Sequence, residues 1–197
     1  MVIIVMCLIE KMEMYAKANF VPIARKENIA YLQKIIKDEN LFEILELGSA
    51  IGYSAICMAS ADDKVRITTI ERDQTMYQEA IKNIKEAKKD SQIEVIYDDI
   101  FNVNLKNRRF DLIFIDAAKA QYIKFFEMFS PLLKDNGVII SDNLELLDLQ
   151  KLTNSKKSKR LVEKMNEYRQ YLVDLKEYTT EFLAIGDGFA ITRKISD

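Results

Sequence analysis

The chain of 197 residues contains no histidine and no tryptophan, and it has only two cysteines. Without histidine, a Ser-His-Asp triad, a histidine general base and a histidine-ligated metal are all excluded. Any general base must therefore be an Asp, Glu, Lys or Tyr side chain, or a group activated by a metal. Cys7 and Cys57 are too few for a disulfide framework or for a cysteine-rich zinc site.

Long apolar runs and an excess of one charge are also missing. The apolar opening, Met1–Ile9, is too short to span a bilayer and runs directly into Glu10 and Lys11, so we expect neither a membrane partner nor a signal peptide. The net charge of −2 argues against a globally basic nucleic-acid binder but leaves room for a local patch. With 49% apolar and 30% charged residues, we expect a single domain, residues 1–197, located in the cytoplasm.

Apolar strand-like segments alternate with helix-like segments, which is typical of a parallel α/β sheet. The predicted strands are Glu43–Gly48, Arg66–Glu71, Ile93–Asp98, Phe110–Asp116, Gly137–Asn143, Glu177–Ile185 and Phe189–Lys194. The predicted helices are Cys7–Asn19, Lys26–Lys37, Tyr53–Ala61, Gln74–Lys88, Ala120–Leu133 and Lys159–Leu175. Asp187 and Gly188 lie between the last two strands and indicate a hairpin. We predict a seven-stranded, mostly parallel sheet with a C-terminal antiparallel hairpin and helices on both faces.

A glycine turn joins the first predicted strand to the next helix, where residues 43–54 read E-I-L-E-L-G-S-A-I-G-Y-S. Gly48 and Gly52 remove side chains where a ligand must approach the backbone. The spacing G-x-x-x-G lacks the dinucleotide fingerprint G-x-G-x-x-G, which disfavours a nicotinamide dehydrogenase. Glu71 ends the second strand at about the separation expected of an acid that binds ribose hydroxyls.

Three carboxylates, Glu46, Glu71 and Asp99, lie at successive strand ends. Because they come without a phosphate cradle, they favour a nucleoside cofactor that carries positive charge. S-adenosylmethionine, with its sulfonium and ammonium groups, matches that requirement. The same residues would also suit a tight turn with capped strands, so cofactor binding is a hypothesis at this point.

A second polar group follows two later strands and consists of Asp116, Asp142 and Asn143. Since the carboxyl ends of parallel strands meet at one edge of a sheet, these side chains are expected to lie close together. Two carboxylates and an amide are hard oxygen ligands, which suit Mg²⁺ or Ca²⁺ rather than zinc. Ordinary strand-end caps use the same residue types, and that alternative stays open.

Five runs occur together in order: E-L-G-S-A-I-G-Y-S (46–54), T-I-E-R-D (69–73), F-I-D-A-A-K-A-Q-Y (114–122), S-D-N (141–143) and I-G-D-G-F-A-I (185–191). In these runs the chain resembles the cation-dependent class I O-methyltransferases, which include catechol and caffeoyl-CoA methyltransferases. It looks most similar to their short bacterial branch, the tRNA 5-hydroxyuridine methyltransferases. The resemblance covers most of the chain from about Tyr15 onward, and it implies a Rossmann-like class I methyltransferase fold and a homodimer.

The resemblance also implies roles for single residues. S-adenosylmethionine would be bound by Glu46, Gly48, Ser49, Gly52, Tyr53, Ser54, Glu71, Arg72, Asp99, Ile100 and Asp116. A divalent cation, usually Mg²⁺, would be held by Asp116, Asp142 and Asn143. Lys119 lies where the family has its catalytic lysine, with Asp116 beside it in the catalytic set, and Tyr122 where it has a tyrosine of the substrate-binding wall. Asp98 departs from the family, which often has glycine there.

The segment Lys151–Lys164 bears on the substrate because it is rich in Lys and Arg. It could contact a phosphate backbone, with Lys156, Lys157, Lys159 and Arg160 as substrate-binding candidates, although a solvated basic helix start would look the same. Catechol and 5-hydroxyuridine both offer two adjacent oxygens to a metal, so metal geometry does not choose between them. We predict a methyltransferase for 5-hydroxyuridine at the tRNA wobble position, with a small-molecule catechol or phenol methyltransferase as the alternative. A binding module without catalysis is the rival from another class.

Overall fold

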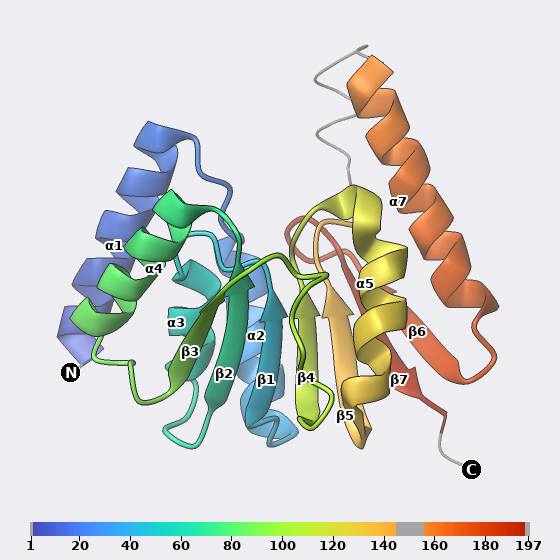
Figure 1. Ribbon diagram of the computed structural model, residues 1–197, viewed down its shortest axis with the longest axis horizontal. Helices are drawn as coiled ribbons and strands as arrows, with labels where there is room; N and C mark the ends of the chain where they lie inside the picture. Colours follow the sequence, from blue (N-terminus) through green and yellow to red (C-terminus); the bar gives the residue numbers. More distant parts are fainter. Residues whose placement is uncertain (1, 145–155, 196–197) are drawn as a thin grey trace. The chain divides into compact units, whose positions relative to one another are not determined.

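The computed structural model describes residues 2–144 and 156–195 (Figure 1). Two compact units make up the chain, residues 1–105 and 106–197. The seven strands have the order β3-β2-β1-β4-β5-β7-β6, of which β1 to β3 belong to the first unit and β4 to β7 to the second. Their bounds are β1 Glu43–Leu47, β2 Arg66–Glu71, β3 Ile93–Tyr97, β4 Phe110–Ile115, β5 Leu133–Ser141, β6 Tyr178–Leu183 and β7 Phe189–Lys194. The predicted fold class is confirmed.

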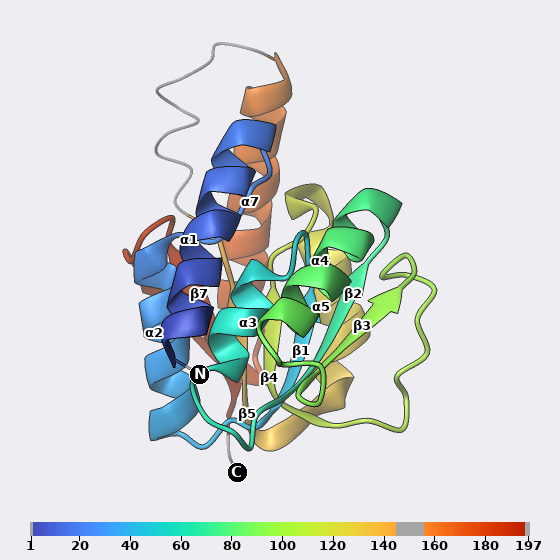
Figure 2. The same ribbon diagram turned by 90° about the vertical axis from the view of Figure 1, so that its left-hand side faces the viewer.

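The first unit pairs β1 with β2 and β2 with β3, all in parallel. Four consecutive residues of β1 are buried, as expected of a strand covered on both faces. Its helices are α1 (Val2–Asn19), α2 (Lys26–Asp38), α3 (Tyr53–Ala59) and α4 (Gln74–Glu86). In Figure 1, α2 lies behind β1 and α4 in front of the strands, and Figure 2 shows α1, α2 and α3 side by side.

The second unit pairs β4 with β5 in parallel, and β7 runs antiparallel to both β5 and β6. The predicted hairpin, with the last strand inserted beside its partner, is therefore confirmed. The helical elements of this unit are η1 (Lys119–Gln121), α5 (Tyr122–Phe129), η2 (Ser130–Leu132) and α7 (Lys156–Asp174). The ring of Phe126 on α5 packs edge-on against Tyr171 of α7 and Tyr178 of β6, so these helices are fastened by aromatic contacts.

Several predicted elements have other bounds in the structure, and α1 for example begins at Val2 and not at Cys7. The helix predicted over Ala120–Leu133 is instead a 3₁₀ turn, a short α-helix and a second 3₁₀ turn that contains Pro131, which interrupts helical hydrogen bonding. Strand β5 begins at Leu133 rather than at Gly137, because the three residues that follow Leu133 are polar and carry no apolar signal. Within the described residues, no helix is long and apolar enough to cross a membrane.

Gly137 is required by a close approach between β5 and β4. The pairing register shifts there, from Phe110 opposite Leu133 to Leu112 opposite Val138. A Cβ at position 137 would lie 2.9 Å from the backbone oxygen of Asp111 and 2.7 Å from Leu133 Cδ1. Both distances are too short for a van der Waals contact of a Cβ atom. A backbone oxygen cannot move aside as a flexible side chain can.

Gly137→Ala is therefore expected to destabilise the protein by about 1–3 kcal/mol through overpacking. Urea denaturation followed by circular dichroism would measure the loss. Asn136→Ala is the matched control, because Asn136 is exposed and next in sequence; its effect should stay within about 0.5 kcal/mol. Equal stability of the Gly137→Ala protein and the wild type would contradict this account.

Candidate active site

The glycine turn after β1 has an unusual backbone. Gly48, Ala50 and Gly52 have φ values of 99°, 44° and 80°, all in the left-handed region that glycine tolerates best. The backbone N–H groups of Gly48 and Ser49 both donate to the carbonyl of Ile70, at 3.2 and 3.1 Å. The turn is thus bound to the end of β2 before α3 begins.

Glu71 supports this turn from the end of β2. Its Oε2 accepts a hydrogen bond from the Ala50 N–H, and its Oε1 accepts one from the Asp73 N–H, both at 2.8 Å. A carboxylate has further lone pairs, so these bonds leave acceptor capacity for a ligand. The predicted role of Glu71 as a ribose acid and its role as a strand cap are therefore compatible.

Glu46 is fully buried. Its two carboxylate oxygens accept hydrogen bonds from Ser54 Oγ and Thr69 Oγ1, each at 2.5 Å. These bonds tie the start of α3 to β1 and β2. Both oxygens of this buried carboxyl group are thus satisfied by hydroxyl donors.

The hydroxyl of Ser49 in this turn lacks a hydrogen-bond partner among the described residues. The Oγ atom is buried, and the residue is 2% exposed. Buried hydroxyls are normally bonded, so an unsatisfied one inside a glycine turn fits a bound polar ligand. The turn, Ser49 and Glu71 together form a cradle suited to a nucleoside-type cofactor.

Asp99 and Arg72 join the ends of β3 and β2. Arg72 Nη1 lies 3.1 Å from Asp99 Oδ2, and the Phe101 N–H donates to Asp99 Oδ1 at 3.0 Å. The Phe101 N–H and the Arg72 guanidinium hold the pKa of Asp99 below its usual value. Ile100, also predicted at the cofactor site, is half-buried beside them.

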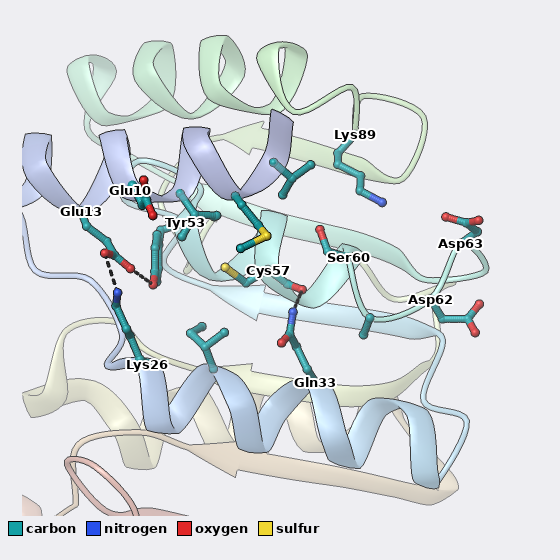
Figure 3. Close-up of a pocket in the computed structure, with 15 residues that line it drawn as sticks. Glu10, Glu13, Lys26, Gln33, Tyr53, Cys57, Ser60, Asp62, Asp63 and Lys89 are labelled. Carbon is teal, nitrogen blue, oxygen red and sulfur yellow. Dashed lines mark hydrogen bonds and ion pairs between the residues drawn. The ribbon is translucent and has the colours of Figure 1, made fainter. Parts of the chain in front are cut away.

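Tyr53 directs its side chain toward the two N-terminal helices. Figure 3 shows its ring directed toward Glu13 of α1 and Lys26 of α2. Tyr53 OH donates to Glu13 Oε1 at 3.0 Å, and Lys26 Nζ pairs with Glu13 Oε2 at 2.9 Å. Since the side chain of Tyr53 is 3% exposed and engaged there, only its backbone is left for the predicted cofactor contact.

In the second unit, the three predicted metal ligands come together as expected. Asp116 directly follows β4, and Asp142 and Asn143 directly follow β5. The Asp142 N–H donates to the Ile115 carbonyl at 3.1 Å, and Asn143 Nδ2 donates to Asp116 Oδ1 at 3.4 Å. Asn143 has a φ of 62°, and its N–H donates to Asp142 Oδ1 at 2.6 Å, so the backbone itself turns the pair toward Asp116.

The electrostatics of this group are those of crowded carboxylates. Burial, then the nearby charge of Asp116, raises the pKa of Asp142 to about 8. Burial also raises the pKa of Asp116, while Lys119 opposes the shift and Asp187 adds to it. Asp187, from the turn between β6 and β7, was predicted only as a hairpin residue; a lone Asp-Gly carries no signal for this second position.

A cation would relieve this arrangement. Among the described residues, no group of three or more His, Cys, Asp or Glu side chains is placed to hold a metal. The predicted set instead has two carboxylates and one amide, hard oxygen donors that fit Mg²⁺ or Ca²⁺. Burial raises the pKa of both carboxyl groups, and the charges of Asp116 and Asp187 raise that of Asp142 further, which is the condition that a bound cation removes. The residues therefore fit a divalent cation.

Tyr122 and Lys119 flank the same group. Lys119 opens η1 and is half-buried, and its charge favours the ionised forms of both aspartates. Tyr122 is only 1% exposed, and its OH donates to the Asp142 carbonyl at 3.3 Å. Tyr122 thus supports the backbone of Asp142, and its place in the substrate-binding wall stays a prediction.

Helix α7 holds the Asp142 segment at two points that the sequence did not suggest. Tyr168 OH and Ser141 Oγ share a hydrogen bond of 2.6 Å, and Arg169 Nη1 donates to the Leu144 carbonyl at 3.4 Å. Tyr168 also packs edge-on against Tyr122, with ring centroids 5.3 Å apart. The segment that carries Asp142 and Asn143 is therefore fastened on both sides by one helix.

Tyr168→Phe should lower the free energy of unfolding by about 1–3 kcal/mol, because it leaves the buried Ser141 hydroxyl without its partner. Its effect on a bound divalent cation should be a loss of affinity of roughly 10-fold, as for other groups that orient ligands. Urea denaturation and Mn²⁺ titration by electron paramagnetic resonance would measure the two quantities. Tyr171→Phe removes the same atom from a half-buried ring and should change neither.

The predicted substrate-binding cations lie at the start of α7. Lys156, Lys159 and Arg160 are exposed there, as a phosphate-binding surface requires. The Lys157 side chain and residues 151–155 lie outside what the structure describes. Helix α7 begins three residues before its predicted start, so all four predicted cations belong to its first two turns.

Comparisons with known proteins agree with this architecture. The family model described as O-methyltransferase matches residues 5–195. A crystal structure from Staphylococcus aureus, described as a candidate caffeoyl-CoA O-methyltransferase, is 38% identical with a TM-score of 0.88 and covers 94% of this chain and 91% of its own. A catechol O-methyltransferase from Niastella koreensis is 36% identical over 107 residues, 51% of this chain and 48% of that protein.

A third likeness concerns the fold alone. The O-methyltransferase from Bacillus cereus in complex with SAH is 23% identical, with a TM-score of 0.80, and covers 96% of this chain and 91% of its own. The family match spans nearly the whole chain and includes both the glycine turn and the Asp116–Asp142–Asn143 group. The chain belongs to the O-methyltransferase family.

Proposed function

We propose that this protein is an S-adenosylmethionine-dependent and Mg²⁺-dependent O-methyltransferase that acts on a substrate with two adjacent oxygens. The observation that carries the proposal is the convergence of Asp116, Asp142 and Asn143 after β4 and β5 in a chain of the O-methyltransferase family. If these residues were only strand caps, there would be no reason to place two carboxyl groups together where burial raises the pKa of both.

Support for the cofactor comes from the first unit. The left-handed glycine turn, the unpartnered Ser49 hydroxyl, and Glu71 form the proposed nucleoside cradle. Carboxyl groups without a phosphate cradle, among them the buried Glu46, favour a cofactor that carries a positive charge. The Bacillus cereus neighbour holds SAH, the product of methyl donation from S-adenosylmethionine.

The proposed reaction is a displacement at the methyl carbon. A bound Mg²⁺ would supply Lewis-acid chemistry, orienting two substrate oxygens and lowering the pKa of one. Asp116, Asp142 and Asn143 would hold it, and Tyr122 and Tyr168 would keep Asp142 in place. The substrate hydroxyl would lose its proton, to Lys119 Nζ or to water, its oxygen would bond to the methyl carbon, and the carbon–sulfur bond would break. The products are the methyl ether and S-adenosylhomocysteine.

For the substrate we propose 5-hydroxyuridine at the wobble position of tRNA. The exposed Lys156, Lys159 and Arg160 at the start of α7 support a phosphate-backbone contact. A small catechol is the second candidate, favoured by the similarity to the catechol enzyme of Niastella koreensis. A homodimer and a cytoplasmic location remain predictions that go with this assignment.

Mass spectrometry of tRNA nucleosides from cells that lack the protein would test the substrate. Loss of 5-methoxyuridine-type nucleosides, restored by the wild-type gene, is the expected result. Unchanged nucleosides would overturn the tRNA assignment, and turnover of a catechol by the purified protein would then support the second candidate. Loss of all turnover on adding EDTA, with recovery on adding Mg²⁺, would separate an enzyme from a binding module.

The cations of α7 give a sharper prediction. Replacing Lys159 and Arg160 together with alanine should lower kcat/KM for tRNA about 10-fold or more and make it less sensitive to salt, because phosphate contacts release counterions. Turnover of a small catechol should be unchanged. Lys176→Ala is the control, since Lys176 is also exposed but follows the far end of α7. An equal loss in the control would show that the cations act only through net charge.

A further inference from the structure

A pocket in the first unit has no part in the proposed reaction. It lies between α1, α2 and α3, and has a volume of about 790 Å³ (Figure 3). Sites for small organic ligands usually measure about 300–1,000 Å³. Apart from Tyr53, none of its lining residues was predicted to contact cofactor, metal or substrate. The ring of Tyr53 is turned into the pocket, where its hydroxyl donates to Glu13.

The middle of the pocket is apolar. Ile9 and Val5 contribute from α1, Ile29 from α2 and Cys57 from α3. Met6 lies at the same pocket and is 61% exposed, although methionine side chains usually avoid water. An aliphatic chain in the pocket would cover this surface.

Several polar groups of the pocket already have partners. Glu13 accepts from Tyr53 and pairs with Lys26. Gln33 donates to the Cys57 carbonyl at 2.7 Å. Lys89 donates to the Ala59 carbonyl at 3.0 Å and to Gln92 at 2.6 Å, which fastens the end of α3. These groups build the walls and do not determine the ligand.

The two ends of the pocket carry further carboxylates. Glu10 lies at one end of the pocket, and Asp62 and Asp63 lie at the other (Figure 3). Within the described part of the chain, no hydrogen bond or ion pair engages the carboxylates of Glu10 and Asp63, and only their longer-range charges act on Lys26 and Lys89. Four carboxylates and two ammonium groups line the pocket in total, so its charge is negative and lies at the two ends.

We propose that this pocket binds an alkyl diamine or polyamine. One ammonium group meets Glu10, the other meets Asp62 and Asp63, and the methylene chain lies against Ile9 and Ile29. Two separated acidic ends favour a ligand charged at both ends over one with a single charged head. An apolar middle favours methylene groups over a sugar or a peptide. The inference is independent of the methyl-transfer proposal.

Isothermal titration calorimetry of the full-length protein with α,ω-diaminoalkanes, from 1,3-diaminopropane to 1,12-diaminododecane, tests the proposal. Affinity should pass through a maximum at one chain length, because only one length lets both ammonium groups reach their carboxylates. At that length, the corresponding monoamine should bind about 5-fold more weakly or worse, since it loses one ion pair. The corresponding diol should not bind detectably.

Variants locate the site. Glu10→Gln and Asp63→Asn should each weaken the best diamine about 3- to 10-fold, and Ser60→Trp, at an exposed lining position, should block the pocket. Asp38→Asn removes the same charge from an exposed position outside the pocket and should leave affinity within twofold. Thermal melts check that each variant is folded. If Glu10→Gln does not fold, the affinity of the Asp63→Asn protein tests the proposal.

Three results would overturn the proposal. They are an affinity that rises steadily with chain length, an equal loss in Asp38→Asn, and monoamine binding as tight as diamine binding. The first two indicate general attraction to an acidic protein, and the third indicates a site for a singly charged amphiphile. None of them bears on methyl transfer, because every titration is run without methyl donor or acceptor.

Discussion

Replacing Asp142 with asparagine is expected to abolish methyl transfer while making the metal-free protein more stable above pH 7. Asparagine keeps the shape and the acceptor oxygen that receives the Asn143 N–H, but it removes a buried negative charge next to Asp116. Loss of a ligand should lower kcat/KM by more than about 100-fold, since even groups that only orient ligands cost 10- to 100-fold. Removing the unfavourable charge should raise the melting temperature in EDTA.

The two opposite effects make this variant informative. Turnover is measured with saturating Mg²⁺, stability by thermal melts in EDTA at pH 8.5, and cofactor binding by calorimetry, where affinity should be unchanged because the proposed cofactor residues keep their contacts. Asp135→Asn is the control, because Asp135 is exposed on β5 and far less constrained. Wild-type turnover by the Asp142→Asn protein would show that Asp142 is only a strand cap.

The strand ends were predictable because composition changes abruptly there. Strands β2 and β7 have their predicted bounds, and β1, β3 and β4 end one residue before the predicted end. In β1, β2 and β4 the buried run stops where a glycine or a carboxylate residue begins, and that boundary is local in sequence. The convergence of Asp116 with Asp142 and Asn143 followed from parallel pairing, which the structure has.

Contacts set by tertiary packing were not predictable in the same way. Asp187 joins the carboxylate group from the turn between β6 and β7, and Tyr168 reaches Ser141 from the middle of α7. Neither has a spacing relation to Asp142, because both depend on how the hairpin and the helix pack. The sequence did not reveal the early start of β5 for a different reason. Residues 134–136, directly after Leu133, are polar, and the shift in pairing register near Gly137 breaks the strand alternation.

Tyr122 and Tyr53 show the limit of assigning a side chain by position alone. Both lie at the start of a helix next to a proposed site, and both were predicted to contact a ligand. In the structure each ring is buried and each hydroxyl donates to a neighbouring element, the Asp142 carbonyl for Tyr122 and Glu13 for Tyr53. A buried phenol needs a partner for its hydroxyl, and that demand directed both side chains inward.

Melting temperature should depend on pH in opposite ways with and without metal. The pKa of Asp142 is raised from 3.8 in the unfolded chain to about 8 in the folded protein, so the folded state holds the extra proton between these values. Stability in EDTA is therefore highest near the lower limit and falls as pH rises toward 8. One proton corresponds to about 1.4 kcal/mol per pH unit, or roughly 3–5 °C for a chain of this size.

Mg²⁺ should reverse this trend, because ligands must be deprotonated to bind a cation and metal binding then releases the proton. The rise in melting temperature on adding 10 mM MgCl₂ is expected to be small at pH 5.5 and to grow steadily up to pH 8.5. Asp142→Asn should remove most of the pH slope in EDTA and most of the Mg²⁺ effect, whereas Asp135→Asn should keep both. A melting temperature in EDTA that is flat or rises from pH 5 to 8 would mean that Asp142 is not buried as a carboxylic acid, and the cation would lose its physical reason to bind there.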